Sequence, residues 1–303
     1  MRALVTGASG FVGPHLCAHL RAMGDDTIDP GDEHDHFDVT DREAVDRVLA
    51  RVRPDVLYHL AARSNVAASW RDPVACLRVN VEGTQNVLDA ARAHGVDRVL
   101  VIGSAEEYGR VDPADLPLRE DAPLRPVSPY GASKVAASYL ALQACLGAGL
   151  ETIRVRAFNH TGPGQRPDFF VPGLAHRIAE AERSGLGAIA AGALDAERDI
   201  GDVRDVVRAY RLLVEHGTPG EVYNVCTGRA VAIRAIADHL LGRATRPLRI
   251  ETDPALLRRA DLPVLVGDAT RVRDATGWTP AIPLTETLDA VLAEARAAAA
   301  QGS

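Results

Sequence analysis

The stretch TGASGFVG, at residues 6–13, decides the fold, because its glycines follow the spacing GxxGxxG between a predicted strand and a predicted helix. In this arrangement the first glycine makes a tight turn, the second lets the backbone approach a pyrophosphate, and the third lets helix and strand pack closely. The amino end of the helix then faces the phosphate charge. The stretch predicts a dinucleotide-binding turn formed by Gly7, Gly10, Phe11, Val12 and Gly13.

Outward from this turn, β-branched runs of strand length alternate with segments of helical periodicity. The predicted strands are Arg2–Thr6, Asp55–Leu60, Arg98–Gly103, Glu151–Ala157 and Glu221–Val225. The predicted helices are Phe11–Met23, Val79–His94, Ser128–Leu146, Pro172–Ser184, Val203–Glu215 and Pro283–Ala299. Strands separated by helix-length segments form right-handed βαβ units. We therefore expect an α/β fold with a doubly wound, Rossmann-type parallel sheet, which the last predicted strand rejoins.

Composition excludes several classes of protein. The chain has 303 residues and a formal net charge of −7, which argues against a generic nucleic-acid binder. No uncharged apolar run approaches the roughly 20 residues of a membrane helix, and the amino terminus does not resemble a secretory signal. The cysteines lie far apart without CxxC spacing, which predicts buried thiols in the cytoplasm and neither a metal site nor disulfides. They are Cys17, Cys76, Cys145 and Cys226.

Further candidate cofactor contacts follow the later strands. Asp38, with Val39 beside it, could bond an adenine amino group, although a helix N-cap at Thr40 or Asp41 explains the same residues. Small residues at the end of the next strand would let a dinucleotide lie close to the backbone; these are Leu60, Ala61 and Ala62. The amide of Asn80 could tie neighbouring strands together.

The choice of nicotinamide cofactor depends on the end of the second strand. Residues 24–41 contain several acidic residues and neither lysine nor arginine, and Asp29 lies where a ribose-reading residue is expected. A carboxylate there suits a free 2′-hydroxyl and repels a 2′-phosphate. We therefore expect NAD(H) in preference to NADP(H), with Arg63 as the residue that could reverse this.

Tyr130 and Lys134, in the sequence YGASK, lie one helical turn apart and therefore on one face of the predicted helix. A free tyrosine ionises near about pH 10, and a neighbouring ammonium is expected to lower this pKa toward neutrality. Alone, the pair could equally be a surface tyrosine stacked over a lysine stem. Ser104 ends a predicted strand at the carboxyl edge of the sheet, where such folds bind ligands. The three residues together predict an acid–base site.

The glycine stretch, Ser104 and the Tyr130–Lys134 pair, in this order, resemble the extended short-chain dehydrogenase/reductase family of NAD-dependent epimerases and dehydratases. The resemblance covers essentially the whole chain. It implies a dinucleotide-binding domain at residues 1–157, with 203–226 returning to it, and a smaller α/β substrate domain at 158–202 and 227–303.

The resemblance also implies roles for individual residues. Tyr130 would be the acid–base group, Ser104 would orient the substrate, and Lys134 would bind the nicotinamide ribose. Tyr130, Lys134 and Phe158 would thus all contact the cofactor. Enzymes of this family commonly form homodimers through two helices of each subunit, so a homodimer is expected by analogy.

Two segments resemble the part of the family that binds nucleotide-linked sugars. In FNHTGPGQ (158–165) Asn159 would reach the diphosphate, and in RDIGDVRDV (198–206) Arg198 would grip a phosphate. Arg258 is a second candidate clamp, since a guanidinium meets two phosphate oxygens at once. Ser104, Ala105, Glu106 and Val171 complete the predicted substrate contacts.

The same segment FNHTGPGQ and the stretch RRADLPVLVGDATRVRDATGWTP (258–280) look most like enzymes that act on GDP-mannose derivatives. The resemblance implies an NAD(P)H-dependent reduction of the C4 ketone of a GDP-4-keto-6-deoxy-mannose. Glu106 keeps a 4,6-dehydratase open, because such enzymes carry there the carboxylate that removes the C5 proton, although Ala105 replaces their usual polar residue. A 4-epimerase is a third possibility. A non-catalytic dinucleotide binder is disfavoured because Tyr130 and Lys134 are both present.

Overall fold

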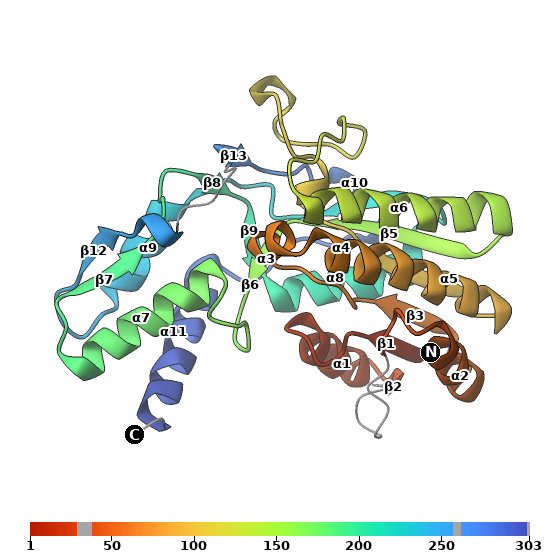
Figure 1. Cartoon of the computed structure of the whole chain (residues 1–303), viewed down its shortest axis with the longest axis horizontal. Helices are drawn as coiled ribbons and strands as arrows, with labels where there is room; N and C mark the ends of the chain where they lie inside the picture. Colours follow the sequence, from red (N-terminus) through yellow and green to blue (C-terminus); the bar gives the residue numbers. More distant parts are fainter. Residues whose placement is uncertain (29–37, 257–261, 302–303) are drawn as a thin grey trace.

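The computed structural model describes residues 1–28, 38–256 and 262–301, and its centre is a six-stranded parallel sheet (Figure 1). The strand order is β10-β5-β4-β3-β1-β2. The strands are β1 (Arg2–Thr6), β2 (Asp26–Ile28), β3 (Val56–His59), β4 (Arg98–Ile102), β5 (Glu151–Ala157) and β10 (Val222–Val225). Every pairing within this sheet is parallel, including that of β10 with β5. The predicted α/β fold with a doubly wound sheet is confirmed.

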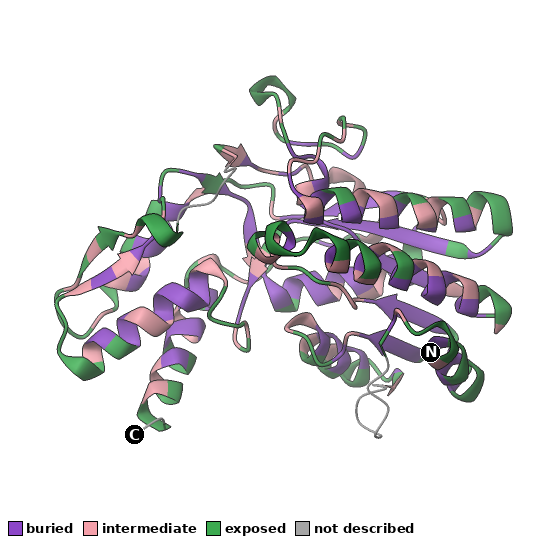
Figure 2. Cartoon of the chain, viewed as in Figure 1, coloured by how far each residue is buried: buried purple, intermediate pink, exposed green. Residues whose placement is uncertain are grey.

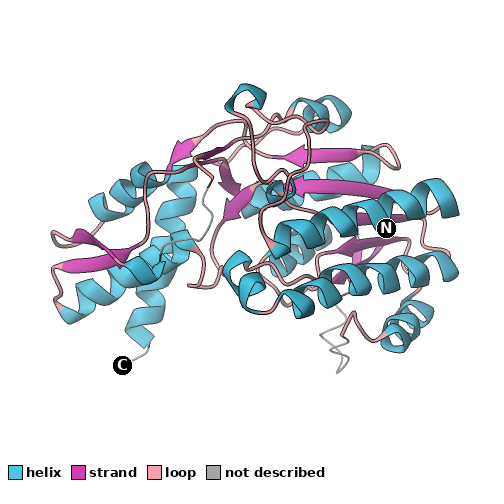
Figure 3. Ribbon diagram, turned by 45° about the horizontal axis from the view of Figure 1, so that its top comes forward, coloured by secondary structure: helices cyan, strands magenta, loops and turns pink. Residues whose placement is uncertain are grey.

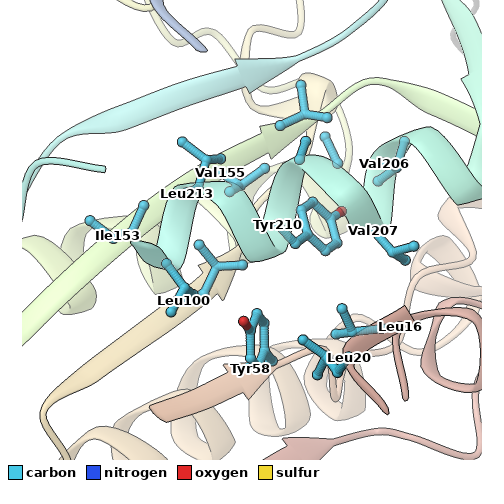
Figure 4. Close-up of a cluster of buried hydrophobic side chains, with 14 of the residues drawn as sticks. Leu16, Leu20, Tyr58, Leu100, Ile153, Val155, Val206, Val207, Tyr210 and Leu213 are labelled. Atoms are coloured by element: carbon cyan, nitrogen blue, oxygen red, sulfur yellow. The ribbon is translucent and has the colours of Figure 1, made fainter. Parts of the chain in front are cut away.

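The inner strands β1, β3 and β4 are buried on both faces and are almost continuously apolar, as is typical of parallel sheets, whereas β5 also buries Arg154 and Arg156 (Figure 2). Alternate residues enter different cores: Tyr58 packs on one face and Leu57 on the other. The helices on the Tyr58 face are α1 (Val12–Ala22), α8 (Val203–His216) and α10 (Thr270–Thr276). The helices on the opposite face are α2 (Arg42–Val52), α5 (Gly83–Ala93) and α6 (Pro129–Ala148). Figure 4 shows the first of these cores.

The region predicted as one helix from Val79 to His94 contains two elements. A π-helical turn, η1 (Arg78–Glu82), leads into α5. Two short helices that the sequence reading missed precede it, α3 (Val66–Arg71) and α4 (Pro73–Leu77). Each has an N-cap side chain, Asn65 or Asp72, that accepts a bond from its first turn.

A second core lies beside the sheet domain and is built mainly from helices (Figure 3). Its helices are α7 (Phe170–Ser184), α9 (Ile233–Gly242) and α11 (Leu284–Gln301). The strands outside the large sheet are β6 (Asn159–Thr161), β7 (Ala188–Ala191), β8 (Glu197–Arg198), β9 (Ile200–Asp202), β11 (Val231–Ala232), β12 (Arg249–Thr252) and β13 (Val264–Leu265). The remaining short helical turns are η2 (Ala105–Glu107), η3 (Pro113–Asp115) and η4 (Pro254–Leu256).

One segment lies away from the domain to which the sequence reading assigned it. Val272 and Trp278 pack in the core beneath the large sheet, against α8 and β10. The apolar side chains of α10 are therefore buried on the dinucleotide side, although residues 227–303 were expected to form part of the substrate domain.

All four cysteines are free thiols, three of them buried and Cys145 partly exposed. Among the helices of the described residues, none combines the length and the apolar character needed to span a membrane.

Candidate active site

The glycine turn between β1 and α1 has no room for a side chain at Gly7 or Gly13. Gly7 has φ of +73°, and a Cβ there would lie 2.7 Å from the backbone nitrogen of Ala61. The Gly10 amide donates to the Gly7 carbonyl at 3.0 Å, which closes the turn. A Cβ on Gly13 would overlap the backbone of Ala8, so α1 and the turn pack in direct contact. The backbone is thus exposed where a pyrophosphate would approach.

The amino end of α1 also fits a dinucleotide. Its N-cap, Phe11, makes no capping hydrogen bond, and its first turn holds no acidic residue. By contrast, α2 is capped by Asp41 and has Glu43 in its first turn. An uncapped helix terminus of this kind favours an anion. The Phe11 ring stacks on His160 of β6, with ring centroids 6.0 Å apart, and so links the glycine turn to the segment after β5.

The end of β3 carries the next predicted cofactor contacts. Leu60, Ala61 and Ala62 are all partly exposed. Asn80 is buried, accepts from the Arg63 amide at 2.8 Å and donates to the Ser133 hydroxyl at 2.8 Å. Asn80 therefore ties the end of β3 to α6, and not one strand to another as its position in the sequence suggested.

Other predicted cofactor contacts have structural explanations. The exposed Asp38 carboxylate accepts from the Thr40 amide, and the Val39 side chain is buried with its carbonyl bonded to Asn86. Asp41 is the N-cap of α2, as the alternative interpretation held. The Phe158 ring is packed in a core with Tyr108, and the contact of this residue with the cofactor stays a prediction. Asp29 lies outside the described residues.

Ser104, Tyr130 and Lys134 come together at the carboxyl edge of β4. Ser104 follows β4 and begins η2, while Tyr130 lies in the first turn of α6, which Ser128 caps. The Ser104 side chain lies near enough to the Tyr130 hydroxyl to lower its pKa. The Lys134 ammonium donates to the Ile102 carbonyl at 2.7 Å and lies 6.0 Å from the centre of the Tyr130 ring.

Burial dominates the electrostatics of this trio. It raises the pKa of Tyr130 above its ordinary value; the Ser104 side chain opposes the rise, and Glu106 and Glu107 add to it. Burial lowers the pKa of Lys134 to about 8, against the opposing effect of Glu107. The prediction of a tyrosine pKa lowered by Lys134 is wrong here, because desolvation is the larger effect and the ammonium is bonded to a carbonyl. The phenol is consequently protonated at neutral pH.

The predicted substrate residues separate into exposed and buried groups. Asn159 is exposed on β6, opposite Ile200 of β9, and Glu106 is partly exposed and acts electrostatically on Tyr130. Arg198 is buried and donates to the carbonyls of Glu197 and Leu262. Ala105 is buried in the core that holds Tyr108, and Val171 is buried in the core formed by α7, α9 and α11; their contacts with substrate stay predictions. Arg258 lies outside the described residues.

The sequence reading missed a buried ion pair below Ser104. Glu107 and Arg156 are joined at 2.9 Å, and their side chains are 0% and 5% exposed. The available signal was an arginine at the buried end of a predicted strand, since a buried cation needs a partner. The partner could not be read from the chain, because the two residues are 49 positions apart.

A dinucleotide turn and a serine–tyrosine–lysine site at one edge of a parallel sheet define an oxidoreductase of the short-chain type. The sequence profile of the NAD dependent epimerase/dehydratase family matches residues 3–226, and the chain belongs to this family.

Known members of the family match along the whole chain. The GDP-6-deoxy-D-mannose reductase of Pseudomonas aeruginosa is 38% identical over 296 residues, covering 97% of this chain and 96% of the relative. A UDP-glucose 4-epimerase of Mycolicibacterium smegmatis is 34% identical over 310 residues, with 94% and 96% covered. A solved structure of RMD from Pseudomonas aeruginosa with NADPH superposes with a TM-score of 0.90 at 37% identity, covering 98% of this chain and 99% of the other.

Proposed function

We propose that this chain uses NAD(P)H to reduce the C4 ketone of a GDP-linked 4-keto-6-deoxy-mannose. The observation that carries the proposal is the buried Tyr130 phenol, which lies beside Ser104 and has the Lys134 ammonium 6.0 Å from the centre of its ring. A reductase needs a proton donor at this position, and the phenol is one. The similarity to a GDP-6-deoxy-D-mannose reductase over nearly the whole chain supports the choice of substrate.

Each residue of the site would have a separate role in a carbonyl reduction. When bound, the reduced nicotinamide would supply a hydride to the carbonyl carbon. The Ser104 hydroxyl donates a hydrogen bond to the carbonyl oxygen, and Tyr130 gives that oxygen a proton as negative charge develops. The Lys134 ammonium, 6.0 Å from the ring, stabilises the phenolate that remains. The glycine turn and the amino end of α1 would hold the pyrophosphate, and Lys134 the ribose.

The test is a substrate panel. GDP-4-keto-6-deoxy-mannose with NADH or NADPH should give a loss of nicotinamide absorbance stoichiometric with a sugar product two hydrogens heavier. Tyr130→Phe should abolish turnover and leave NAD(P)H binding intact. Wild-type protein that binds both ligands and leaves the ketone unreduced would contradict the proposal.

The same panel examines two other reactions. Glu106, partly exposed beside Tyr130, is placed to act as the base of a 4,6-dehydratase, but its neighbour Ala105 is buried and offers no acid for the departing hydroxide. GDP-mannose converted to a 4-keto sugar without added reductant would establish dehydration. The similarity to a UDP-glucose 4-epimerase makes epimerisation at C4 the other alternative, recognised by interconversion without net change in the cofactor.

We infer that Asn159 and Arg198 contact the diphosphate of the substrate. Asn159 is exposed on β6, and the pairing of β6 with β9 brings it close in space to the segment that follows Arg198. The carbonyls of Glu197 and Leu262 fix the Arg198 guanidinium. Arg198→Ala should weaken nucleotide-sugar binding far more than NAD(H) binding, and an equal loss of both in a folded variant would contradict this role.

We further propose that NAD(H) is preferred to NADP(H). In addition to the acidic segment 24–41, the Arg63 guanidinium lies 3.6 Å from the Asp72 carboxylate, which competes with a 2′-phosphate for this cation. The ratio of kcat/KM for NADH to that for NADPH should exceed one, and Arg63→Ala should leave the NADH value unchanged. A ratio below one that rises in Arg63→Ala would contradict the preference, because it would mean that Arg63 binds the 2′-phosphate.

A homodimer in the cytoplasm completes the proposal. Large apolar side chains are exposed on α3, α4 and α6, and α4 packs against α6. They are Trp70, Val74, Leu77, Tyr139 and Leu146. An apolar surface of this kind suits a second copy of the chain. Analytical ultracentrifugation should show a dimer that Tyr139→Glu with Leu77→Glu dissociates, and a wild-type monomer at micromolar concentration would contradict it. Cell fractionation tests the location.

A further inference from the structure

The Glu107 carboxylate lies directly beneath Ser104 and is completely buried. Its Oε1 accepts from the Ser104 backbone amide at 2.9 Å, while the Ser104 hydroxyl oxygen accepts from the Glu106 amide at 3.1 Å. This reciprocal pair is a capping box that closes η2. The backbone and the hydroxyl of Ser104 are therefore both fixed by the turn that Glu107 ends.

Arg156 anchors the carboxylate to the sheet. Its Nε donates to Oε2 of Glu107 at 2.9 Å, and its Nη1 donates to the Tyr108 hydroxyl and to the Glu120 carbonyl at 3.1 and 2.8 Å. Since Arg156 belongs to β5, the position of Ser104 is set by the neighbouring strand as well as by β4. Gly103 leaves room for this arrangement, because a Cβ there would overlap the Glu107 carboxylate.

Stability does not explain a buried pair of this kind. Desolvation of both ions offsets most of their attraction, and apolar residues of similar volume usually serve a core as well or better. The capping role alone does not require Arg156 either, since η2 is a single turn and its N-cap bonds need only the carboxylate. What the pair adds is a rigid link from the serine to β5.

We propose that Glu107 is a positioning residue, which with Arg156 holds the Ser104 hydroxyl against Tyr130. The proposal rests on the proposed function, in which Ser104 and Tyr130 act together on the substrate carbonyl. It extends the site by two residues that touch neither substrate nor cofactor.

Glu107→Gln is the main test, because glutamine has the same shape but one oxygen for two donors. Either the Ser104 amide or the Arg156 Nε then loses its acceptor, and both outcomes break the link that holds the Ser104 amide to β5. We expect kcat to fall about tenfold to a hundredfold, as for other misplaced catalytic groups, with KM and NAD(H) affinity changed less than about threefold. Hydrogen exchange at the Ser104 amide should accelerate. The matched control is Glu182→Gln, which breaks the Glu182–Arg296 pair between α7 and α11 and should leave kcat unchanged.

A double variant separates positioning from folding. Glu107→Leu with Arg156→Leu removes both charges, so its melting temperature should be closer to that of the wild type than the melting temperature of Glu107→Gln is. Its kcat should stay low and exchange at the Ser104 amide should stay fast. Recovery of kcat together with stability would overturn the proposal and leave the pair a purely structural one. Unchanged kcat and unchanged Ser104 exchange in Glu107→Gln would overturn it as well.

If the proposed reductase activity is absent, the experiments give a different result from the one expected if only the positioning role of Glu107 is wrong. Wild-type protein would then not reduce the keto sugar, and kcat would be measured for the nucleotide-sugar reaction that the panel reveals. The Ser104 exchange rate needs no substrate, so unaltered exchange in Glu107→Gln refutes the positioning role in either case.

Discussion

Lys134→Met is expected to stabilise the protein while abolishing its activity. The lysine is almost fully buried, and burial lowers its pKa from 10.5 to about 8. Near pH 7 this shift corresponds to an unfavourable contribution of about 3 kcal/mol to folding, at about 1.4 kcal/mol for each pKa unit. The variant also loses the hydrogen bond to the Ile102 carbonyl, which should lower its stability by about 1 kcal/mol. Methionine fills the same volume without a charge, so we expect a net gain of about 2 kcal/mol near pH 7.

The pH dependence distinguishes this cause from better packing. The folded protein binds the Lys134 proton less tightly than the unfolded chain, so the unfavourable contribution is fully present below about pH 8 and disappears as the pH approaches 10.5. Between about pH 7 and about pH 9.5 the advantage of Lys134→Met should therefore shrink by about 2 kcal/mol. Urea unfolding of both proteins at the two pH values measures it. A variant less stable than the wild type near pH 7, or a difference independent of pH, would refute the reasoning.

Three further substitutions test other parts of the fold. The Tyr210 side chain is buried beneath the sheet (Figure 4), and its hydroxyl has no hydrogen-bond partner among the described residues. Tyr210→Phe should therefore raise the free energy of unfolding by about 1 kcal/mol in urea titrations, and a decrease would mean that the hydroxyl is paired. Ser128→Ala removes the N-cap of α6, the helix that carries Tyr130, and should cost about 1 kcal/mol in the same assay, whereas no loss would show that the cap is dispensable. Gly13→Ala places a Cβ against the Ala8 backbone and should abolish NADH binding measured by fluorescence, while Gly187→Ala, which meets nothing within 4 Å, should leave it unchanged. Normal binding by Gly13→Ala would show that the turn tolerates a side chain.

Local sequence patterns predicted the elements of the sheet domain well. β1 and β5 begin and end at the predicted residues, because each is a short β-branched run bounded by turn residues. α2 was missed although its apolar residues recur at helical spacing behind an Asp41 cap; the buried ones are Val45, Val48, Leu49 and Val52. That pattern would have been sufficient to find it.

The site was predictable only where its residues have fixed spacing or a fixed place in the fold. Tyr130 and Lys134 are one helical turn apart, and Ser104 follows a strand, so local reasoning located all three. The Glu107–Arg156 pair joins a turn to a strand 49 residues away, and no local pattern encodes such a contact. The extent of burial at the site could not be predicted from the sequence either. Burial reversed the expected shift of the Tyr130 pKa, because desolvation depends on how α6 packs over β4.

This reversal bears on the direction of the reaction. Burial drives both titratable groups of the site toward their neutral forms, raising the pKa of Tyr130 and lowering that of Lys134. Reduction begins with a protonated phenol that gives up its proton, which is the form that burial favours. Epimerisation begins with removal of a proton from a sugar hydroxyl, for which the phenolate must form first, against desolvation and the nearby Glu106 and Glu107 carboxylates. The resting phenol is thus the form from which reduction starts, but reduction itself leaves the phenolate that burial disfavours, so Lys134 must stabilise that anion in either reaction.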